Sequence, residues 1–344
     1  MAQFLLGMTL SELGGVCKAA GLKPFVAKQM ADWLYKKRVK TIEEMANISK
    51  ENRARLSSEY EVGRISPAEI QTSKDGTRKY AFEAVRPGRY IEAVMIPDRD
   101  RATLCVSSQA GCRMGCKFCM TGRQGFHGNL SAREIISQFM DVEEAELLTN
   151  AVFMGMGEPL DNWENVHKAI EILTADWGFG WSPKRITLST IGDLATLKEF
   201  LDTTACHLAV SLHNPFHTER LELMPVENRY PLEDVLALVR QYDFTGQRRV
   251  TFEYIVFAGM NDTKRHASEL ARLLRGLECR VNLIRFHKIP DFPYESSPDA
   301  VMTMFRDRLS AHGITCTIRA SRGEDILAAC GMLAGKNKLN SARL

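Results

Sequence analysis

The 344-residue sequence contains no apolar run that approaches the roughly 20 residues of a membrane-spanning helix. Its first residues, MAQFLLGMTLSELGG, lack a basic leader followed by a sustained apolar segment, so we expect no secretory signal and a cytoplasmic location. Only 8% of the residues are aromatic, and 24 Gly and 12 Pro are too few for a fibrous or low-complexity chain. The composition therefore predicts a folded globular protein.

The chain has little net charge. A formal charge of +3 does not by itself indicate a nucleic-acid partner. The basic excess is uneven, because residues 1–64 hold eleven Lys and Arg against seven Asp and Glu, and the tail 331–344 adds three basic residues without an acid. The N-terminal cations fit a solvated surface and an RNA-contacting surface equally well.

The cysteines are too few and too unevenly placed for a disulfide framework. Nine is an odd number, and four of the nine lie within fifteen residues, at Cys105, Cys112, Cys116 and Cys119. Such clustering in a reducing compartment favours metal ligation. The scattered cysteines Cys17, Cys206, Cys279 and Cys316 are expected to be small core residues.

Residues 1–64 are predicted to form a small helical N-terminal accessory domain. Thr9 with Glu12 and Thr41 with Glu44 have the spacing of capping boxes, which begin helices. Asp75-Gly76 and Pro87-Gly88 predict tight turns, so residues 65–100 are expected to be a β-hairpin extension and linker.

Beyond residue 100, short apolar segments alternate with longer amphipathic ones. This alternation predicts six β-α repeats and a parallel sheet, either open or a partial barrel, over residues 101–330. Residues 314–319 are expected to add an edge strand, and residues 331–344 form the basic tail. In both architectures the chemistry is expected at the carboxyl ends of the strands. The six strands are predicted at 103–108, 151–155, 185–190, 207–213, 250–257 and 281–286.

A cysteine triplet, Cys112-x3-Cys116-x2-Cys119, follows the first of these strands. Three thiolates on one short loop can hold three irons of a 4Fe–4S cluster and leave the fourth iron open to a ligand. Adding Cys105 would instead give a four-thiolate zinc site. Cys105 is expected within a strand, which makes the zinc interpretation the weaker one.

The triplet and a second motif together resemble the radical S-adenosylmethionine (SAM) superfamily. Gly155-Met156-Gly157-Glu158-Pro159 follows the second strand and is similar to the motif that holds the SAM amino group in that superfamily. Glycines allow close backbone approach, and a carboxylate suits an ammonium group. The resemblance implies a radical SAM partial (β/α)6 barrel, one 4Fe–4S cluster with three cysteine ligands, and SAM as cofactor.

Further motifs resemble the RlmN family of radical SAM RNA methyltransferases. They include RATLCVSSQAGCRMGCKFCMTGRQGF (101–126), TLSTIG (187–192), AVSLHNP (209–215) and RGEDILAACGMLAG (322–335). By this resemblance Gly157, Glu158, Ser189, Ser211, Leu212 and His213 contact SAM. The family often has Asn after the sixth strand. This chain has His287 there, so His287 is a further candidate SAM contact.

The resemblance also implies how an adenine carbon is methylated. Cys330 corresponds to the thiol that carries the methyl group, and Cys105 to the thiol that then forms a transient disulfide with it. Glu92 corresponds to the base that removes a proton from the protein–RNA adduct. Without the resemblance, Cys105 and Cys330 would be interpreted as buried core residues and Glu92 as an exposed strand acid.

The implied substrates are carbon 2 of an adenosine in 23S rRNA and of one in the anticodon loop of some tRNAs. Two alternatives stay open: a carbon-8 adenine methyltransferase of the Cfr type or another radical SAM enzyme, and a zinc-stabilised RNA-binding protein. An electron donor such as flavodoxin or ferredoxin is expected, as is a monomer without membrane contact. The N-terminal cations, Arg113, Lys117, Arg123 and the basic tail are candidate phosphate contacts.

Overall fold

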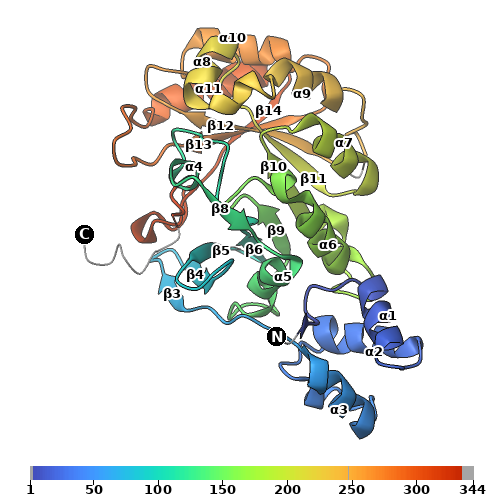
Figure 1. Ribbon diagram of the computed structural model, residues 1–344. Coiled ribbons are helices and arrows are strands. Elements are labelled where there is room, and N and C mark those ends of the chain that lie inside the picture. The colour runs from blue at the N-terminus through green and yellow to red at the C-terminus, as the bar shows by residue number, and fades with distance from the viewer. Residues whose placement is uncertain (1–2, 247, 335–344) are drawn as a thin grey trace.

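The computed structural model describes residues 3–246 and 248–334, which form an open α/β sheet with a helical domain at its N-terminal side (Figure 1). The main sheet has ten strands in the order β14-β13-β12-β11-β10-β9-β6-β5-β4-β3. From β6 to β14 neighbouring strands pair in parallel, as predicted for the repeats and the edge strand. The parallel strands are β6 (Arg101–Cys105), β9 (Asn150–Phe153), β10 (Ile186–Thr190), β11 (His207–Ser211), β12 (Val250–Val256), β13 (Arg280–Arg285) and β14 (Thr315–Ile318).

The predicted hairpin extension is joined to this sheet. Its strands β3 (Glu69–Thr72), β4 (Arg78–Glu83) and β5 (Tyr90–Asp98) are antiparallel, and β5 pairs with β6. The extension therefore lengthens the sheet by three strands, which the turn signals alone did not predict. A separate small hairpin of β7 (Gln109–Gly111) and β8 (Phe126–Asn129) encloses the cysteine loop.

The helices lie between the parallel strands in the chain and pack on one face of the sheet. They are α5 (Ala132–Met140), α6 (Trp163–Thr174), α7 (Leu194–Thr203), α8 (His217–Leu223), α9 (Leu232–Val239), α10 (Lys264–Leu273) and α11 (Asp299–Ala311). The amphipathic pattern continues beyond α5 to residue 146, but the helix ends at Met140, and residues 141–147 form bends and turns. Within the described residues, no helix is both long and apolar enough to cross a membrane.

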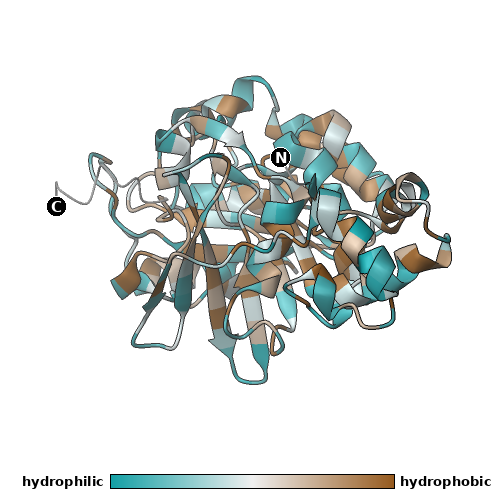
Figure 2. Cartoon of the chain, turned by 60° about the horizontal axis from the view of Figure 1, so that its bottom comes forward, coloured by the Kyte–Doolittle hydropathy of each residue, from teal (hydrophilic) through white to brown (hydrophobic). Residues whose placement is uncertain are grey.

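Burial alternates along β9 and β10 and so identifies the two faces of the sheet there. On β10, Ile186 and Leu188 are fully buried, whereas Thr187 and Ser189 between them are partly accessible. The apolar side chains form a continuous core beneath the helices, and strands of mixed hydropathy are visible in Figure 2. The opposite face is polar, and this is the face available for chemistry.

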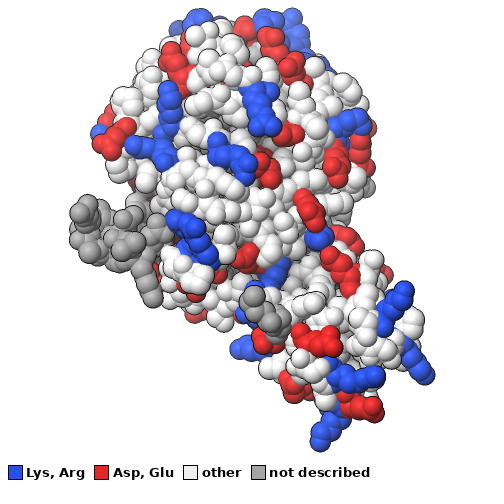
Figure 3. All heavy atoms as spheres, viewed as in Figure 1, with Lys and Arg blue, Asp and Glu red and all other residues white. Residues whose placement is uncertain are grey.

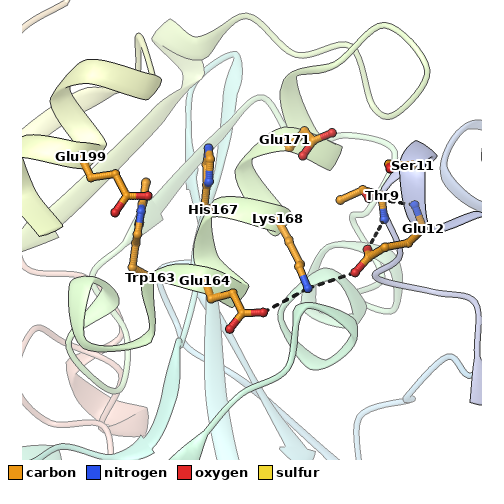
Figure 4. A pocket seen from close by; sticks show the side chains of 9 residues that line it. All are labelled: Thr9, Ser11, Glu12, Trp163, Glu164, His167, Lys168, Glu171 and Glu199. Carbon is orange, nitrogen blue, oxygen red and sulfur yellow. Dashed lines mark hydrogen bonds and ion pairs between the residues drawn. The ribbon is translucent and has the colours of Figure 1, made fainter.

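The N-terminal domain consists of α1 (Leu10–Ala19), α2 (Phe25–Ala31), α3 (Lys50–Glu59) and a parallel pair, β1 (Gln3–Phe4) with β2 (Tyr60–Glu61). The predicted capping boxes at Thr9 and Thr41 are both present. Lys168 of α6 pairs with Glu12 at 3.0 Å, which ties the domain to the barrel across a shallow groove (Figure 4). The N-terminal helices expose both signs of charge (Figure 3).

Candidate active site

The cysteine triplet lies on a tight loop between β7 and α4 (Met120–Arg123). The N–H of Cys112 donates to Gly125 O at 3.0 Å, and the N–H of Cys119 donates to Cys116 O at 3.2 Å. Gly111 has φ +71°, and a Cβ there would lie 1.9 Å from Gly125 O. Only glycine fits this close approach, which brings the start of the cysteine loop against Gly125.

Burial dominates the electrostatics of these thiols. It raises the pKa of Cys112 to about 12 and that of Cys116 well above its ordinary value, and the neighbouring thiols add to both effects. Thiols in this environment ionise readily only when a cationic centre binds them. Their donor chemistry and their placement on one short loop therefore fit an iron–sulfur cluster.

A buried arginine, Arg220 of α8, lies behind the cysteine loop. Its Nε donates to Leu212 O and its Nη2 to Ser211 O, both at 2.9 Å, and its remaining nitrogen pairs with Glu227. The guanidinium lowers the pKa of Cys116, opposing the effect of burial. The sequence analysis did not identify Arg220, because a single arginine on a short helix resembles any surface cation.

Glu158 lies at the carboxyl end of β9, beside the cysteine loop. Its carboxylate accepts hydrogen bonds from the N–H groups of Leu160 at 3.2 Å and Ile191 at 3.1 Å. Burial raises its pKa to about 7. Gly157 has φ +98°, and a Cβ there would lie 2.5 Å from Gln109 Cβ, so the backbone passes unusually close to β7.

The other predicted SAM contacts follow the neighbouring strands. Ser189 and Ser211 lie on the polar face of β10 and β11, and Ser211 is the last residue of its strand. The N–H groups of Leu212 and His213 both donate to Glu253 O. His213 has φ +58° and accepts from Ile255 N–H at 3.1 Å through Nδ1.

His213 is neutral and close to the cysteine loop. Burial, with a contribution from Arg220, lowers its pKa to about 3. Its ring meets Phe118, between Cys116 and Cys119, edge-on at a centroid distance of 4.9 Å. The predicted cluster ligands and the residues at the ends of β9 and β11 are thus brought together at one edge of the sheet, as predicted from the strand order.

His287 lies beyond β13, away from the residues around Glu158. It is buried, its Nδ1 is 3.3 Å from Glu324 Oε1, and it lines the same recess as Cys330. His287 and Cys330 thus line one recess, and the assignment of His287 as a SAM contact stays a prediction.

Cys105 and Cys330 face one another across the polar side of the sheet. Cys105 is the last residue of β6, and burial raises its pKa to about 12, with a further increase from Cys330. The segment of Cys330 is anchored to the cysteine loop, because Met120 N–H donates to Gly331 O at 2.8 Å and Thr121 Oγ1 to Leu333 O at 2.6 Å. The thiol that interacts with Cys105 is thus Cys330, which is not the arrangement expected of a four-thiolate zinc site.

Glu92 of β5 is buried, not exposed as its position in a strand alone would suggest. It pairs with the buried Lys79 of β4 at 3.3 Å, and its Oε2 accepts from the N–H of Ala334 at 2.9 Å. Its own backbone carbonyl accepts from Ser107 Oγ at 2.6 Å. The carboxylate is thus held against the segment that carries Cys330.

A recess of about 500 Å³ connects Cys330 to the amino ends of the parallel strands. It has one acidic residue in its lining, Asp98, and this pairs with Arg101 at 2.6 Å. The recess is therefore strongly basic. Its cationic residues are Arg101, Lys184, Arg185, Arg249, Arg285, Arg319 and Arg322.

Several of the cations predicted to bind phosphate interact with other residues of the chain. Lys37 lies over the ring of Trp33, and Arg113 pairs with Asp161 at 2.9 Å. Arg123 is bonded to the carbonyl of Pro290. The cations of the tail, Lys336, Lys338 and Arg343, lie outside the described residues.

The chain matches two family models. Residues 106–271 match the radical SAM superfamily, and residues 4–62 match the ribosomal RNA large subunit methyltransferase N-terminal domain. Curated relatives are similar along almost their whole length. A protein of Parabacteroides distasonis, named probable dual-specificity RNA methyltransferase RlmN, is 59% identical over 330 residues, which cover 96% of each chain.

Two further similar proteins support the same family. The dual-specificity RNA methyltransferase RlmN of Syntrophus aciditrophicus is 42% identical over 333 residues, covering 96% of this chain and 95% of its own. A crystal structure of a radical SAM methyltransferase from Sphaerobacter thermophilus has a TM-score of 0.90 and 38% identity, covering 96% of this chain and 99% of that one. The chain belongs to the RlmN family of radical SAM RNA methyltransferases, enzymes that use SAM and a 4Fe–4S cluster.

Proposed function

We propose that this enzyme methylates carbon 2 of an adenosine in 23S rRNA and of an adenosine in the anticodon loop of some tRNAs, acting in the cytoplasm as a monomer. The observation that carries the proposal is the neighbourhood of two thiols, the partly buried Cys105 and the exposed Cys330, the second of which lines a basic recess. A carbon of the adenine ring is electrophilic and cannot attack a methyl cation, so direct transfer from SAM fails there. A protein thiol that first accepts the methyl group avoids this difficulty.

The cofactors are assigned to the carboxyl-end side of the sheet. Cys112, Cys116 and Cys119 hold the cluster, and the buried carboxylate of Glu158 binds the SAM ammonium. Together the bound cluster and SAM supply a carbon-centred radical once an electron donor such as flavodoxin or ferredoxin has delivered one electron. The same ends of the strands carry Ser189, Ser211, Leu212 and His213, which orient SAM. His287 makes a further contact with SAM.

The chain's own residues carry the methyl group and the protons. Cys330 attacks a first SAM through sulfur and becomes S-methylated. After loss of a hydrogen atom, the S-methylene carbon on Cys330 adds to carbon 2 of the base. Glu92 then takes the proton from that carbon, since Lys79 and the Ala334 N–H hold its carboxylate next to the Cys330 segment. Cys105 attacks the Cys330 sulfur and releases the methylated base.

RNA reaches the thiols from the amino ends of the strands, opposite the cofactor side. A base must leave its stack to enter such a recess, which costs a few kcal/mol. The arginines at its mouth compensate by contacting the backbone phosphates. The N-terminal domain and the tail supply additional phosphate contacts.

The test is mass spectrometry of nucleosides from RNA incubated with the anaerobically reconstituted enzyme, SAM and a reductant. We expect 2-methyladenosine from both 23S rRNA and tRNA fragments. Formation of 8-methyladenosine would assign the Cfr-type reaction instead. The Cys330→Ala variant, which keeps the cofactor residues, is the matched control and should give neither product.

A further inference from the structure

An ion pair between the partly exposed Arg319 and the buried Glu253 lies on the polar face of the sheet near the two thiols. Arg319 follows β14, and its backbone N–H donates to Leu283 O at 2.9 Å, which extends the pairing with β13. Its Nη1 is 3.6 Å from Glu253 Oε2 and 3.7 Å from the sulfur of Met154. The guanidinium lines the recess together with Cys330.

The carboxylate of Glu253 is fixed by its neighbours on three strands. It is only 3% exposed, and its Oε1 accepts from Asn282 Nδ2 at 2.8 Å and from Thr251 Oγ1 at 3.3 Å. Asn282 is oriented in turn by Thr317 Oγ1 at 2.7 Å. The second oxygen, Oε2, has no hydrogen bond within the described residues and faces Arg319. Glu253 therefore anchors the guanidinium without taking up all of its donors.

The anchored guanidinium acts on both thiols. Burial works to lower the pKa of Arg319, but Glu253, Cys330 and Cys105 outweigh it and raise that pKa. Arg319 in turn lowers the pKa of Cys105, against the effects of burial and of Cys330. The groups that act on Cys105 are thus Cys330, Arg319 and the N–H of Met154, with Glu253 behind the guanidinium.

We propose that Arg319, anchored by Glu253, is a positioning residue that favours the thiolate form of Cys105 for its attack on Cys330. The inference rests on the proposed function, because it assumes that Cys105 resolves the adduct. Only a thiolate attacks sulfur in such exchanges, and a buried thiol needs a cation nearby to ionise near neutral pH. Arg319 lies near this thiol, because its Nη1 is 3.7 Å from the sulfur of Met154, which directly follows β9, and Cys105 of β6 pairs with Val152 of β9.

The step that Arg319 assists is balanced within the protein and the base. The radical adduct becomes closed-shell when it loses the proton to Glu92 and one electron to the oxidised 4Fe–4S cluster. The Cys105 thiolate then attacks the Cys330 sulfur of this adduct. A sulfur–sulfur bond forms and the bond from sulfur to the methylene carbon breaks. Its electron pair stays on that carbon, which takes a proton from solvent and becomes the methyl group. The two thiols are oxidised to the disulfide, and the carbon is reduced.

The first test measures thiol ionisation without RNA. The rate of Cys105 alkylation by iodoacetamide, followed by peptide mass spectrometry across a pH range, should fall about tenfold in Arg319→Met at a given pH, which is one pKa unit. Arg319→Lys keeps a cation and should restore most of the rate. Arg322→Met, a second arginine of the recess, is the matched control and should match the wild type. A wild-type alkylation profile in Arg319→Met would overturn the proposal.

The second test uses the loaded enzyme and RNA. Arg319→Met should accumulate the covalent protein–RNA adduct, and raising the pH should release it, because Cys105 then ionises without the cation. A merely structural defect would not be rescued by pH, so an adduct insensitive to pH overturns the assignment. Should Arg319→Met not fold, the double variant Arg319→Met/Glu253→Gln removes both charges and leaves neither buried alone; it must show the same slowed alkylation of Cys105.

The proposed function and the role of Arg319 can be refuted independently of one another. Absence of 2-methyladenosine from wild-type reactions, with normal Arg319-dependent alkylation, would refute the proposed function and leave the electrostatic relationship standing. Normal methylation by Arg319→Met without trapped adduct would refute the role of Arg319 and leave the proposed function intact.

Discussion

The carboxylate of Glu92 on β5 accepts a hydrogen bond of 2.9 Å from the backbone N–H of Ala334, just beyond Cys330. This bond joins the extension strands to the segment that carries Cys330, the proposed methyl carrier. It places a buried carboxylate next to the proposed site of the adduct. The relationship makes Glu92 the residue whose proton chemistry is most directly testable.

Glu92→Gln should keep the hydrogen bond to Ala334, because an amide oxygen accepts as a carboxylate does, but it cannot take up the proton. We expect product formation to slow by about 100-fold or more, in the range typical of general bases. The adduct should accumulate, measured as a protein–RNA species on denaturing gels. Glu83→Gln on the neighbouring strand β4 is the control, and an unchanged rate in Glu92→Gln would exclude the assigned role.

Replacing any one of Cys112, Cys116 and Cys119 by Ala should abolish reductive SAM cleavage, because each change leaves an iron without its thiolate. Iron content and 5′-deoxyadenosine formation measure the two losses. Cys206→Ala, at a buried cysteine on the far side of the core, should retain both. A triplet variant with a complete cluster and wild-type cleavage would contradict this ligand set.

SAM binding should weaken as the pH falls below about 7, since Glu158 must be ionised to hold an ammonium group and burial raises its pKa to about 7. The raised pKa also means that its contribution to stability, present below pH 4.5, is lost as the pH rises through 7 in the SAM-free protein. Equilibrium binding of SAM between pH 5.5 and 8, conditions chosen to span this value, measures the dependence. Glu158→Gln should bind weakly and without this pH dependence; a pH-dependent Glu158→Gln would assign the titration to another group.

The basic recess should dominate RNA binding. The double variant Arg185→Gln/Arg249→Gln removes two exposed cations at its mouth and should lower the slope of log affinity against log salt by about 0.7–0.9 for each lost phosphate contact. Filter binding at several salt concentrations measures this slope. Arg272→Gln, an exposed arginine of α10 that pairs with Glu269 at 2.7 Å, is the control. Equal slopes for the double variant and the wild type would place the RNA elsewhere.

Short-range patterns in the sequence predicted much of the fold and the candidate residues on the proposed cofactor side of the sheet. The repeats, the edge strand and the turns at Gly76 and Gly88 are confirmed, because alternating hydropathy and turn residues act over short distances. The cysteine triplet needs only one loop, so its clustering was visible in the sequence. The carboxyl ends of parallel strands necessarily meet, which is why Glu158 and His213 could be placed together.

Other features depend on contacts between distant segments. Arg319 follows β14 and Glu253 lies on β12. Neither residue carries a local motif, and their pairing follows only from the register of β12, β13 and β14. The basic recess gathers single cations from the amino ends of β6, β10 and β12 and from the carboxyl ends of β13 and β14, and no window of sequence contains them. The joining of β5 to β6 likewise required the assembled sheet.

The central claim is that Cys330 carries the methyl group to RNA and Cys105 releases it, and Cys105→Ala tests this most directly. The measurement is mass spectrometry of the nuclease- and protease-digested reaction of Cys105→Ala with SAM, reductant and RNA. The account predicts a peptide containing Cys330 joined through one methylene carbon to adenosine, absent when Cys330→Ala is combined with it. Wild-type turnover by Cys105→Ala with no such peptide would contradict the thiol relay.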